Sequence, residues 1–379
     1  MLFRRSSDSL LAHSTRTQPM PARPTTHPRL AHPAPTPRAG THAGVGRRRA
    51  LGALLVAAVG VLPGVAVTSS PASAATSYVV APWGSDKASG TAKKPFRTMR
   101  KGMSMLRAGG TLVVRGGTYA ERIKLSPAQG TASRRITVTN APGERPVVKG
   151  LLWLKGADYW TLHGINVTWS AANDAGEHMV KMSGGVGWRI TRAEIWGARS
   201  YAAVLVAGAP RGWVIDHCWI HNTAATHARN QDHLVYVNAG MGAGLIERNT
   251  LSRSPNGRGV KVGPSSPSRT PIGNLVIRYN TFYDNRGPSN IQLSYGATKV
   301  RIYRNVFVRS GMYTSNVTAH RLNGTGNVVK DNVGWLSPRV ADRASGLWNA
   351  GGNVIANPYI GPGYRVTSGR LAAYGRYAP

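Results

Sequence analysis

Short apolar runs recur after residue 150 at an almost constant spacing. In six of them an aliphatic residue is followed three positions later by a small residue or an asparagine. These pairs are Ile190/Ala193, Ile215/Cys218, Ile246/Asn249, Ile277/Asn280, Ile302/Asn305 and Val329/Asn332. Further strand-length runs alternate with them, centred on Val180, Val204, Val235, Val260 and Ile291. The links of 11, five and nine residues give a period of 25 residues, which predicts an all-β solenoid of parallel strands, three per coil.

Asparagines at equivalent positions of successive coils predict a buried ladder. Parallel strands stack about 4.8 Å apart, so each amide would bond the one above it at a bend. The ladder residues are Asn249, Asn280, Asn305 and Asn332. Cys218 occupies the same position, so we expect it to fill the core and not to act as a nucleophile. As the single cysteine of the chain, it also excludes an intrachain disulfide.

Three links break the period. The nine-residue link lengthens to 13 residues over 167–180 and to 15 over 220–235, and the 11-residue link lengthens to 17 over 260–277. Repeat proteins place insertions in loops, often on one binding face. All three lengthened links border the same predicted sheet, so we expect the functional site there.

The candidate chemistry lies on this sheet. Side chains alternate along a strand, so the residue after each inward-facing one faces outwards. We expect Tyr236 and Lys261 to lie about 5 Å apart on adjacent coils, with His233 and Arg258 beside them. The remaining residues assigned to this patch, as substrate-binding residues, are His227, Arg229, Asp232, Lys181, Gln292, Asn238 and Tyr295. Each alone is ordinary on a surface, but their convergence on one face predicts a site.

The segment Ser77–Leu125 resembles the N-terminal portion of extracellular right-handed parallel β-helix proteins of the pectate-lyase-like superfamily. In that superfamily an amphipathic helix caps the open end of the solenoid, and here the resemblance implies a short capping helix around residues 95–107. The segment 350–371 resembles the usual ending of these proteins. The resemblance implies a right-handed parallel β-helix, a fold shared by lyases, hydrolases, epimerases and adhesins.

A narrower resemblance concerns residues 259–264 and 275–307, which are similar to turns of the chondroitinase B and alginate lyase family. That family uses a lysine on one turn and an arginine on the next as base and acid. Lys261 matches the lysine, whereas Ser294, followed by Tyr295, stands where the family has the arginine. The family's second catalytic residue is therefore not carried over to this chain.

Lyase chemistry suits the residue types of the patch. An acidic polysaccharide is cleaved by β-elimination when a base removes the proton α to the uronate carboxyl, cations stabilise the intermediate, and an acid assists the leaving oxygen. Lys261 suits the base if Arg258 lowers its pKa. Arg258 or Arg229 would neutralise the carboxylate. Tyr236 or His233 would serve as the acid, or exchange the base role with Lys261.

Two alternatives stay open from the sequence. A glycoside hydrolase on the same fold needs two carboxyls about 5–9 Å apart, for which Asp232 would pair with Asp174 or Glu177. A non-catalytic polysaccharide-binding solenoid needs only the charge and aromatic platforms for sugar rings. The tryptophans considered for such platforms are Trp153, Trp169, Trp196 and Trp219.

Composition adds an expected location and partner. Residues 1–74 form a Pro-, Thr- and Arg-rich leader and a signal peptide, in which Arg47–Arg49 precede an apolar run and "ASA" ends at Ala74. We expect export by the general or the twin-arginine route and cleavage near Ala74. The remaining chain has 39 basic and 13 acidic residues, a net charge of +26. Such a surface attracts polyanions, and export favours an anionic polysaccharide over nucleic acid.

The rest of the chain, residues 75–379, is expected to form one domain. It would consist of a cap over about 76–125, coils over about 126–335 and a C-terminal tail over 336–379. We expect a monomer that does not bind the membrane once the signal is removed. The carboxylates are dispersed and the histidines have no regular ligand spacing, so no metal or other cofactor is expected to be required, and Ca²⁺ is a lesser alternative.

Overall fold

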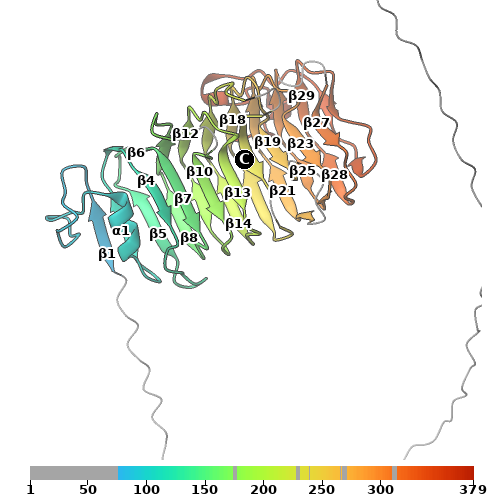
Figure 1. Ribbon diagram of the computed structural model, residues 1–379. Helices are drawn as coiled ribbons and strands as arrows, with labels where there is room; N and C mark the ends of the chain where they lie inside the picture. The colour runs from blue at the N-terminus through green and yellow to red at the C-terminus, as the bar shows by residue number, and fades with distance from the viewer. Residues whose placement is uncertain are drawn as a thin grey trace, which may run out of the picture. The chain divides into compact units, whose positions relative to one another are not determined.

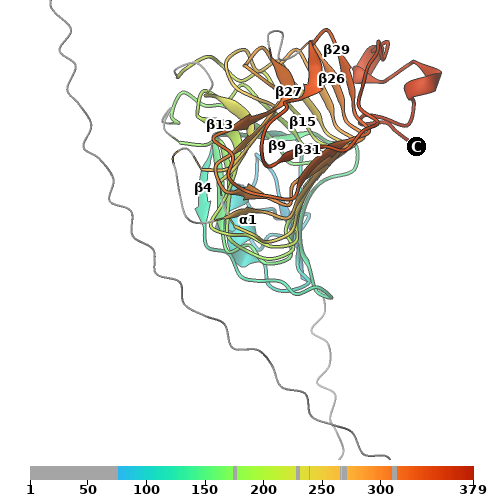
Figure 2. The same ribbon diagram turned by 90° about the vertical axis from the view of Figure 1, so that its right-hand side faces the viewer.

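The computed structural model describes residues 76–173, 177–227, 231–238, 240–264, 266, 271–309 and 314–379. The expected leader, Asp174 and Arg229 lie outside these residues. Figure 1 shows a stack of parallel strands that ascends from β1 to the C-terminal coils, and Figure 2 looks along the stack. This part of the chain is a right-handed parallel β-helix with three strands per coil, as the sequence predicted.

Three parallel sheets of 11, ten and nine strands make up the described coils. The first contains β1 Ser77–Val80, β2 Thr111–Val114, β5 Ile136–Asn140, β8 Trp160–His163, β11 Arg189–Thr191, β14 Trp213–Asp216, β17 Gly244–Glu247, β21 Leu275–Arg278, β25 Arg301–Tyr303, β28 Asn327–Lys330 and β31 Leu347–Asn349. The second contains β3 Gly117–Tyr119, β6 Pro146–Lys149, β9 Asn166–Thr168, β12 Glu194–Trp196, β15 Trp219–His221, β18 Thr250–Ser252, β22 Thr281–Tyr283, β26 Val306–Val308, β29 Val333–Trp335 and β32 Val354–Ile355.

The third sheet is the one beside the lengthened links. It contains β4 Arg122–Leu125, β7 Leu151–Lys155, β10 Val180–Ser183, β13 Ala202–Ala207, β16 His233–Val237, β19 Val260–Val262, β23 Ile291–Ser294, β27 Ser315–His320 and β30 Arg339–Ala341. A separate pair joins β20 Ile272–Gly273 to β24 Ala297–Thr298. The coils average about 27 residues, slightly more than the 25 of the undisturbed period, because inserted loops lengthen some of them.

The register confirms the predicted inward positions. Val204 pairs with Val235, Val235 with Val260, and Val260 with Ile291. All of these side chains are fully buried, and stacked rings extend the core, with Trp188 and Trp213 5.2 Å apart between centroids. Each coil therefore buries its apolar face against the coil above and below it.

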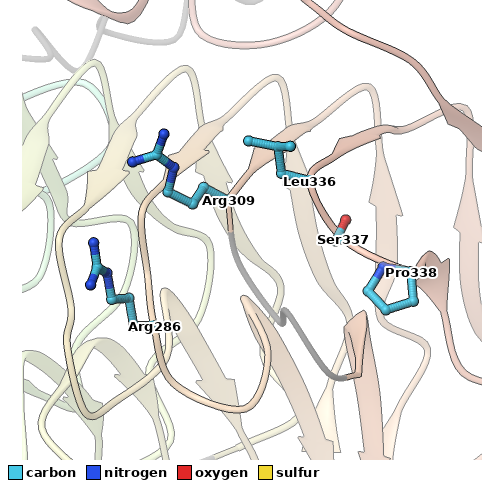
Figure 3. Close-up of a pocket in the computed structure, with 5 residues that line it drawn as sticks. All are labelled: Arg286, Arg309, Leu336, Ser337 and Pro338. Carbon is cyan, nitrogen blue, oxygen red and sulfur yellow. The ribbon is translucent and has the colours of Figure 1, made fainter.

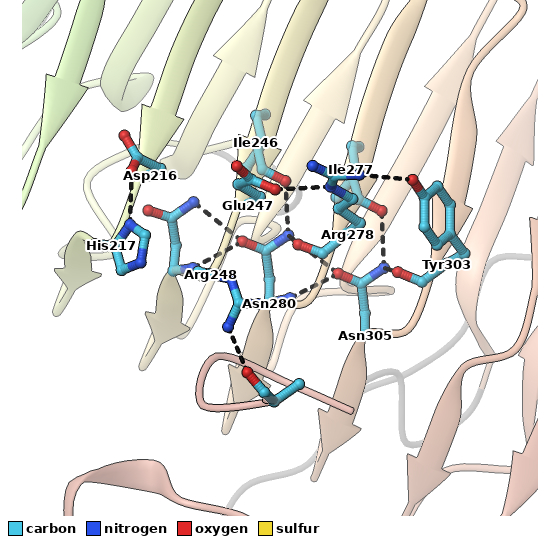
Figure 4. Close-up of polar contacts among 12 residues, drawn as sticks. Asp216, His217, Ile246, Glu247, Arg248, Ile277, Arg278, Asn280, Tyr303 and Asn305 are labelled. Atoms are coloured by element: carbon cyan, nitrogen blue, oxygen red, sulfur yellow. Dashed lines mark hydrogen bonds and ion pairs between the residues drawn. The ribbon is translucent and has the colours of Figure 1, made fainter. Parts of the chain in front are cut away.

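The predicted asparagine ladder is present, and Figure 4 shows its centre. The Oδ1 of Asn280 accepts hydrogen bonds from the backbone N–H and the side-chain amide of Asn249, both at 3.0 Å. Asn280 in turn donates to Asn305 in the same way, at 2.9 and 3.0 Å. Cys218 ends the row by donating its backbone N–H to Asn249, and burial raises the pKa of its thiol to about 12. The thiol is thus a core group, as expected.

A second ladder was not predicted. At the bend between the second and third sheets, Asn285 donates to the Oδ1 of Asn290 at 3.0 Å, and Asn290 donates to Asn316 at 2.9 Å. These asparagines come from irregular segments and from a strand whose apolar pattern is weak, so their positions do not repeat at a fixed spacing in the sequence. The ladder lies at the start of β23 and β27 in the third sheet.

A helix caps the first coil, and the C-terminal segment packs on the side of the second sheet. Helix α1, Met99–Met105, caps the first coil as expected, with Thr98 accepting from the N–H of Lys101 and Glu121 accepting from the N–H groups of Met99 and Arg100. The C-terminal segment, with 3-10 turns η1 Pro362–Tyr364 and η2 Gly369–Leu371, packs apolar side chains on β26 and β29. No helix among the described residues is long and apolar enough to cross a membrane.

Replacing Asn280 by Ala tests the ladder. The substitution leaves the N–H of Asn249 and the carbonyl of Ile246 without their partners in the core, which should lower the free energy of unfolding by about 2–4 kcal/mol. Asn323→Ala, at an exposed position, should change it by less than about 0.5 kcal/mol. Urea denaturation measures both, and equal effects would contradict the ladder's role.

Candidate functional site

The strand register brings the two central predicted residues together. Tyr236 on β16 pairs directly with Lys261 on β19. The Lys261 Nζ lies 4.8 Å from the centroid of the Tyr236 ring, within the range of a cation–π contact. The prediction that these side chains are neighbours on the outward face of the third sheet is confirmed.

His233 and Arg258 lie beside this pair. His233 Nδ1 accepts a hydrogen bond from the backbone N–H of Arg258 at 3.1 Å, so that nitrogen carries no proton. The imidazole meets the Tyr236 ring edge-on, with centroids 5.8 Å apart. We call His233, Arg258 and Lys261 the cationic cluster.

Contrary to expectation, this outward face is not a solvated surface. Lys261 is 8% exposed, Arg258 3% and His233 1%. Alternation along the strands correctly predicts that these side chains leave the core, but it carries no information on what covers them. Burial of this extent takes charged groups out of water, which disfavours their charged forms.

Hydroxyl groups, and not carboxylates, hold the arginine of the cluster. Arg258 donates through Nη1 to Ser289 Oγ and, at 3.4 Å, to Thr318 Oγ1. Neither Arg258 nor Lys261 forms an ion pair with a carboxylate of the described residues. The sequence did not indicate Thr318, because its strand has a weak apolar pattern. In the register of the coils, Ser289 is equivalent to His233, and Thr318 is equivalent to Tyr236.

The uncompensated charges shift the pKa values of the cluster. Burial and then the charge of Arg258 lower the pKa of Lys261 to about 8. Burial also lowers the pKa of Arg258, against the opposing field of Asp342. The pKa of His233 falls well below its ordinary value because of burial, Lys261 and Arg258, so the imidazole is neutral at pH 7. Arg258 therefore lowers the pKa of Lys261 as expected, although burial lowers it more.

Several buried polar atoms on this face lack a hydrogen-bond partner among the described residues. They are His178 Nδ1, His233 Nε2, Arg258 Nε and Ser294 Oγ. Buried polar groups are nearly always satisfied in native proteins. These four atoms belong to residues in or next to strands of the third sheet, from β10 to β23.

Asp232, expected to contact substrate or act as a hydrolytic carboxyl, is instead a loop anchor. Its carboxylate is fully buried and accepts from the N–H groups of Thr226 and His227, from His227 Nδ1 at 2.5 Å and from Asn256 Nδ2 at 2.8 Å. The His227 ring stacks on Tyr201 with centroids 3.7 Å apart. The prediction that Asp232 faces a substrate is wrong, because its acceptor sites are already occupied.

The other predicted residues are spread over the sheet. Gln292 pairs with Lys261 in the next coil and is buried with it. Asn238 is exposed beyond the end of β16. Tyr295 is 8% exposed and meets His320 edge-on with centroids 5.6 Å apart, so it packs against the protein instead of facing a groove. Lys181 lies in the same outward column as Lys261 but leans on Trp153, away from the cationic cluster.

The candidate tryptophan platforms already have neighbours. Trp219 stacks on His221 with centroids 3.9 Å apart, Arg145 lies 5.1 Å from the Trp196 ring, and Trp169 packs on the core. Trp153 carries lysine ammonium groups over its ring. These rings therefore serve contacts within the protein.

A separate hollow of about 490 Å³ opens at the bends between the second and third sheets. Figure 3 shows Arg286 and Arg309 side by side there, with Leu336, Ser337 and Pro338 along the other side. It contains none of the unsatisfied groups of the third sheet. Within the described residues, no group of three or more His, Cys, Asp or Glu side chains is placed to hold a metal ion.

Comparison with known proteins agrees with this fold. Residues 78–233 match the family model of the Pel9A-like, right handed beta helix region. The structure of XylC in complex with xylose superposes with a TM-score of 0.55 at 15% identity, covering 74% of this chain and 68% of that one. Pectate lyase Pel9A gives 0.49 at 16%, over 74% and 81%, and a rhamnogalacturonan lyase gives 0.49 at 14%, over 74% and 85%.

One curated protein shares a short stretch. The uncharacterized protein YwoF of Bacillus subtilis (strain 168) is 39% identical over 71 residues, which are 19% of this chain and 15% of YwoF. The chain thus matches only a small part of that protein's length. Together with the topology, these findings show the fold of the described residues, a right-handed parallel β-helix.

Asp232→Ala tests the role assigned to the loop anchor. Removing the acceptor should speed hydrogen exchange of the Thr226 and His227 amides by at least about tenfold, because both amides donate to Asp232 Oδ2. Asp331→Asn serves as the control, because Asp331 forms a partly exposed ion pair with Lys330. Unchanged protection of Thr226 and His227 in Asp232→Ala would refute the anchor.

Proposed function

We propose that this protein is a polysaccharide lyase that cleaves a uronate-containing polysaccharide by β-elimination. The observation that carries the proposal is Lys261, a nearly buried amine beside Arg258 without a carboxylate partner among the described residues. A cationic cluster of this kind matches a substrate carboxylate, which would supply the missing counter-charge. A lysine with a pKa of about 8 is partly neutral near neutral pH and is able to accept a proton.

The proposed steps give each of these side chains a role. The neutral Lys261 amine removes the proton from the carbon α to the uronate carboxyl, and Arg258 stabilises the negative charge that develops on the carboxylate. The electron pair forms a carbon–carbon double bond as the bond to the glycosidic oxygen breaks. Tyr236, in contact with Lys261, gives its hydroxyl proton to the leaving oxygen. The products are an unsaturated uronate end and a new hydroxyl end.

The contacts of Asp232 and Glu177 support elimination over hydrolysis. A glycosidase needs one carboxyl as acid and a second as base or nucleophile. Asp232 is saturated by protein donors, and Glu177 forms ion pairs with Arg122 and Lys124. Neither of these two expected carboxyls is free for hydrolysis.

Export and partner preference belong to the same proposal. The Arg-led apolar run and the small residues before Ala75 support secretion, and the positive charge supports an anionic polysaccharide as the partner. The protein would act as a monomer without a required cofactor.

Lys261→Ala tests the base. The purified protein should release unsaturated ends, detected by ultraviolet absorbance, from at least one member of a panel of uronate polymers. Lys261→Ala should lower that rate by about 10²–10⁴-fold, the usual contribution of a general base. Lys330→Ala, at a partly exposed lysine, should keep the original rate. Reducing ends without absorbance would indicate hydrolysis, and binding without cleavage would indicate a non-catalytic protein.

The pH dependence tests the state of Lys261. Since the base acts in its neutral form, kcat/KM should rise about tenfold per pH unit and level off near pH 8, the lowered pKa. Arg258→Gln removes a neighbouring positive charge, so it should move the midpoint of this rise to higher pH while also lowering the rate. A plateau that already begins at pH 6 would show that another group is the base.

A further inference from the structure

Three ammonium groups converge on one indole ring in the N-terminal part of the third sheet. The Nζ atoms of Lys181, Lys155 and Lys124 lie 4.0, 4.4 and 5.6 Å from the centroid of Trp153. Strand pairing produces this arrangement, because Lys124, Trp153 and Lys181 follow one another in register on β4, β7 and β10. Trp153 donates its Nε1–H to Ser183 Oγ at 3.0 Å, which fixes the ring. We call these three lysines and Trp153 the Trp153–lysine site.

The indole gathers these cations without neutralising them. A ring attracts ammonium groups through its quadrupole but carries no net charge. Glu177 contacts Lys124 at 3.0 Å and is also bound by Arg122, whereas Lys155 and Lys181 have no ion pair among the described residues. Burial and the charges of Lys155 and Lys124 lower the pKa of Lys181. The site therefore holds like charges close together with a deficit of negative charge.

The site is open to a ligand. A small cavity of about 110 Å³ adjoins it, lined by Leu151, Trp153, Glu177, His178 and Lys181. The side chain of Lys124 is 47% exposed, and Lys155 is exposed. An incoming anion can thus reach the ammonium groups directly.

We propose that the Trp153–lysine site binds a carboxylate of an acidic polysaccharide that also occupies the cationic cluster. Lys181 and Lys261 belong to one outward column, separated by Leu205 and Tyr236. Their strands are three strand spacings apart, about 14 Å. An acidic chain whose carboxylates are spaced about this far apart would therefore contact both places. The identity of the ligand rests on the proposed function.

Calorimetric titration with oligogalacturonates of increasing length tests the site. At pH 6 Lys261 is protonated, so elimination is slow and the oligomers stay intact. Affinity should increase at the oligomer length that reaches both the Trp153–lysine site and the cationic cluster. Lys155→Gln should lower the affinity for these long oligomers about tenfold. Lys149→Gln is the matched control, because Lys149 is exposed on the neighbouring sheet of the same coil. Lys155→Arg should keep the affinity.

The outcomes separate this inference from the proposed function. Oligomers whose carboxyls have been reduced to alcohols should bind Lys155→Gln and the unaltered protein equally weakly. If Lys155→Gln weakens binding but no uronate polymer is cleaved, the site stands and the lyase proposal fails. If Lys155→Gln and Lys149→Gln bind the long oligomer alike, the inference is overturned whatever the activity. Lys124→Gln gives the same test should Lys155→Gln unfold.

Discussion

The hydrogen bonds between successive parallel coils determine where every side chain of this protein lies. They hold equivalent positions about one strand spacing apart, so a property repeated along the sequence becomes a continuous column in space. Inside, the columns are aliphatic side chains and asparagine ladders, in which each amide satisfies its neighbour. Outside, the same stacking forces Lys261 against Tyr236 and three lysines against Trp153.

For function, the consequence is that the outward face of the third sheet has, among its described residues, fewer carboxylates than are needed to neutralise its cations. Arg258 and Lys261 are almost buried, yet hydroxyl groups and an aromatic ring stand where carboxylates would usually neutralise them. Burying cations in this way is unfavourable for folding, and the asparagine ladders and packed core supply the stability that tolerates it. The carboxylates of an acidic polysaccharide would supply the missing negative charge. The third sheet is thus the place where the net positive charge of the chain would have a role in binding.

Much of this arrangement follows from sequence alone, since a fixed period determines register. The 25-residue spacing correctly predicted the inward valines, the first asparagine ladder, the buried Cys218 and the contact between Tyr236 and Lys261. Insertions have no such regularity. The sequence predicts that Asp232 is a reactive carboxylate. Only the folded loop shows that Thr226, His227 and Asn256 donate hydrogen bonds to it. The period likewise indicates which side chains face outwards, but not that Lys261 and Arg258 are covered.

The central claim is that the amine of Lys261 lies in an uncompensated cationic site that accepts a substrate carboxylate. Nuclear magnetic resonance titration of lysine side chains, assigned with Lys261→Gln, measures it directly. The account predicts a Lys261 pKa of about 8 in the free protein, rising when a uronate oligomer brings a negative charge beside it. An ordinary lysine pKa that does not change on adding the oligomer would contradict the account.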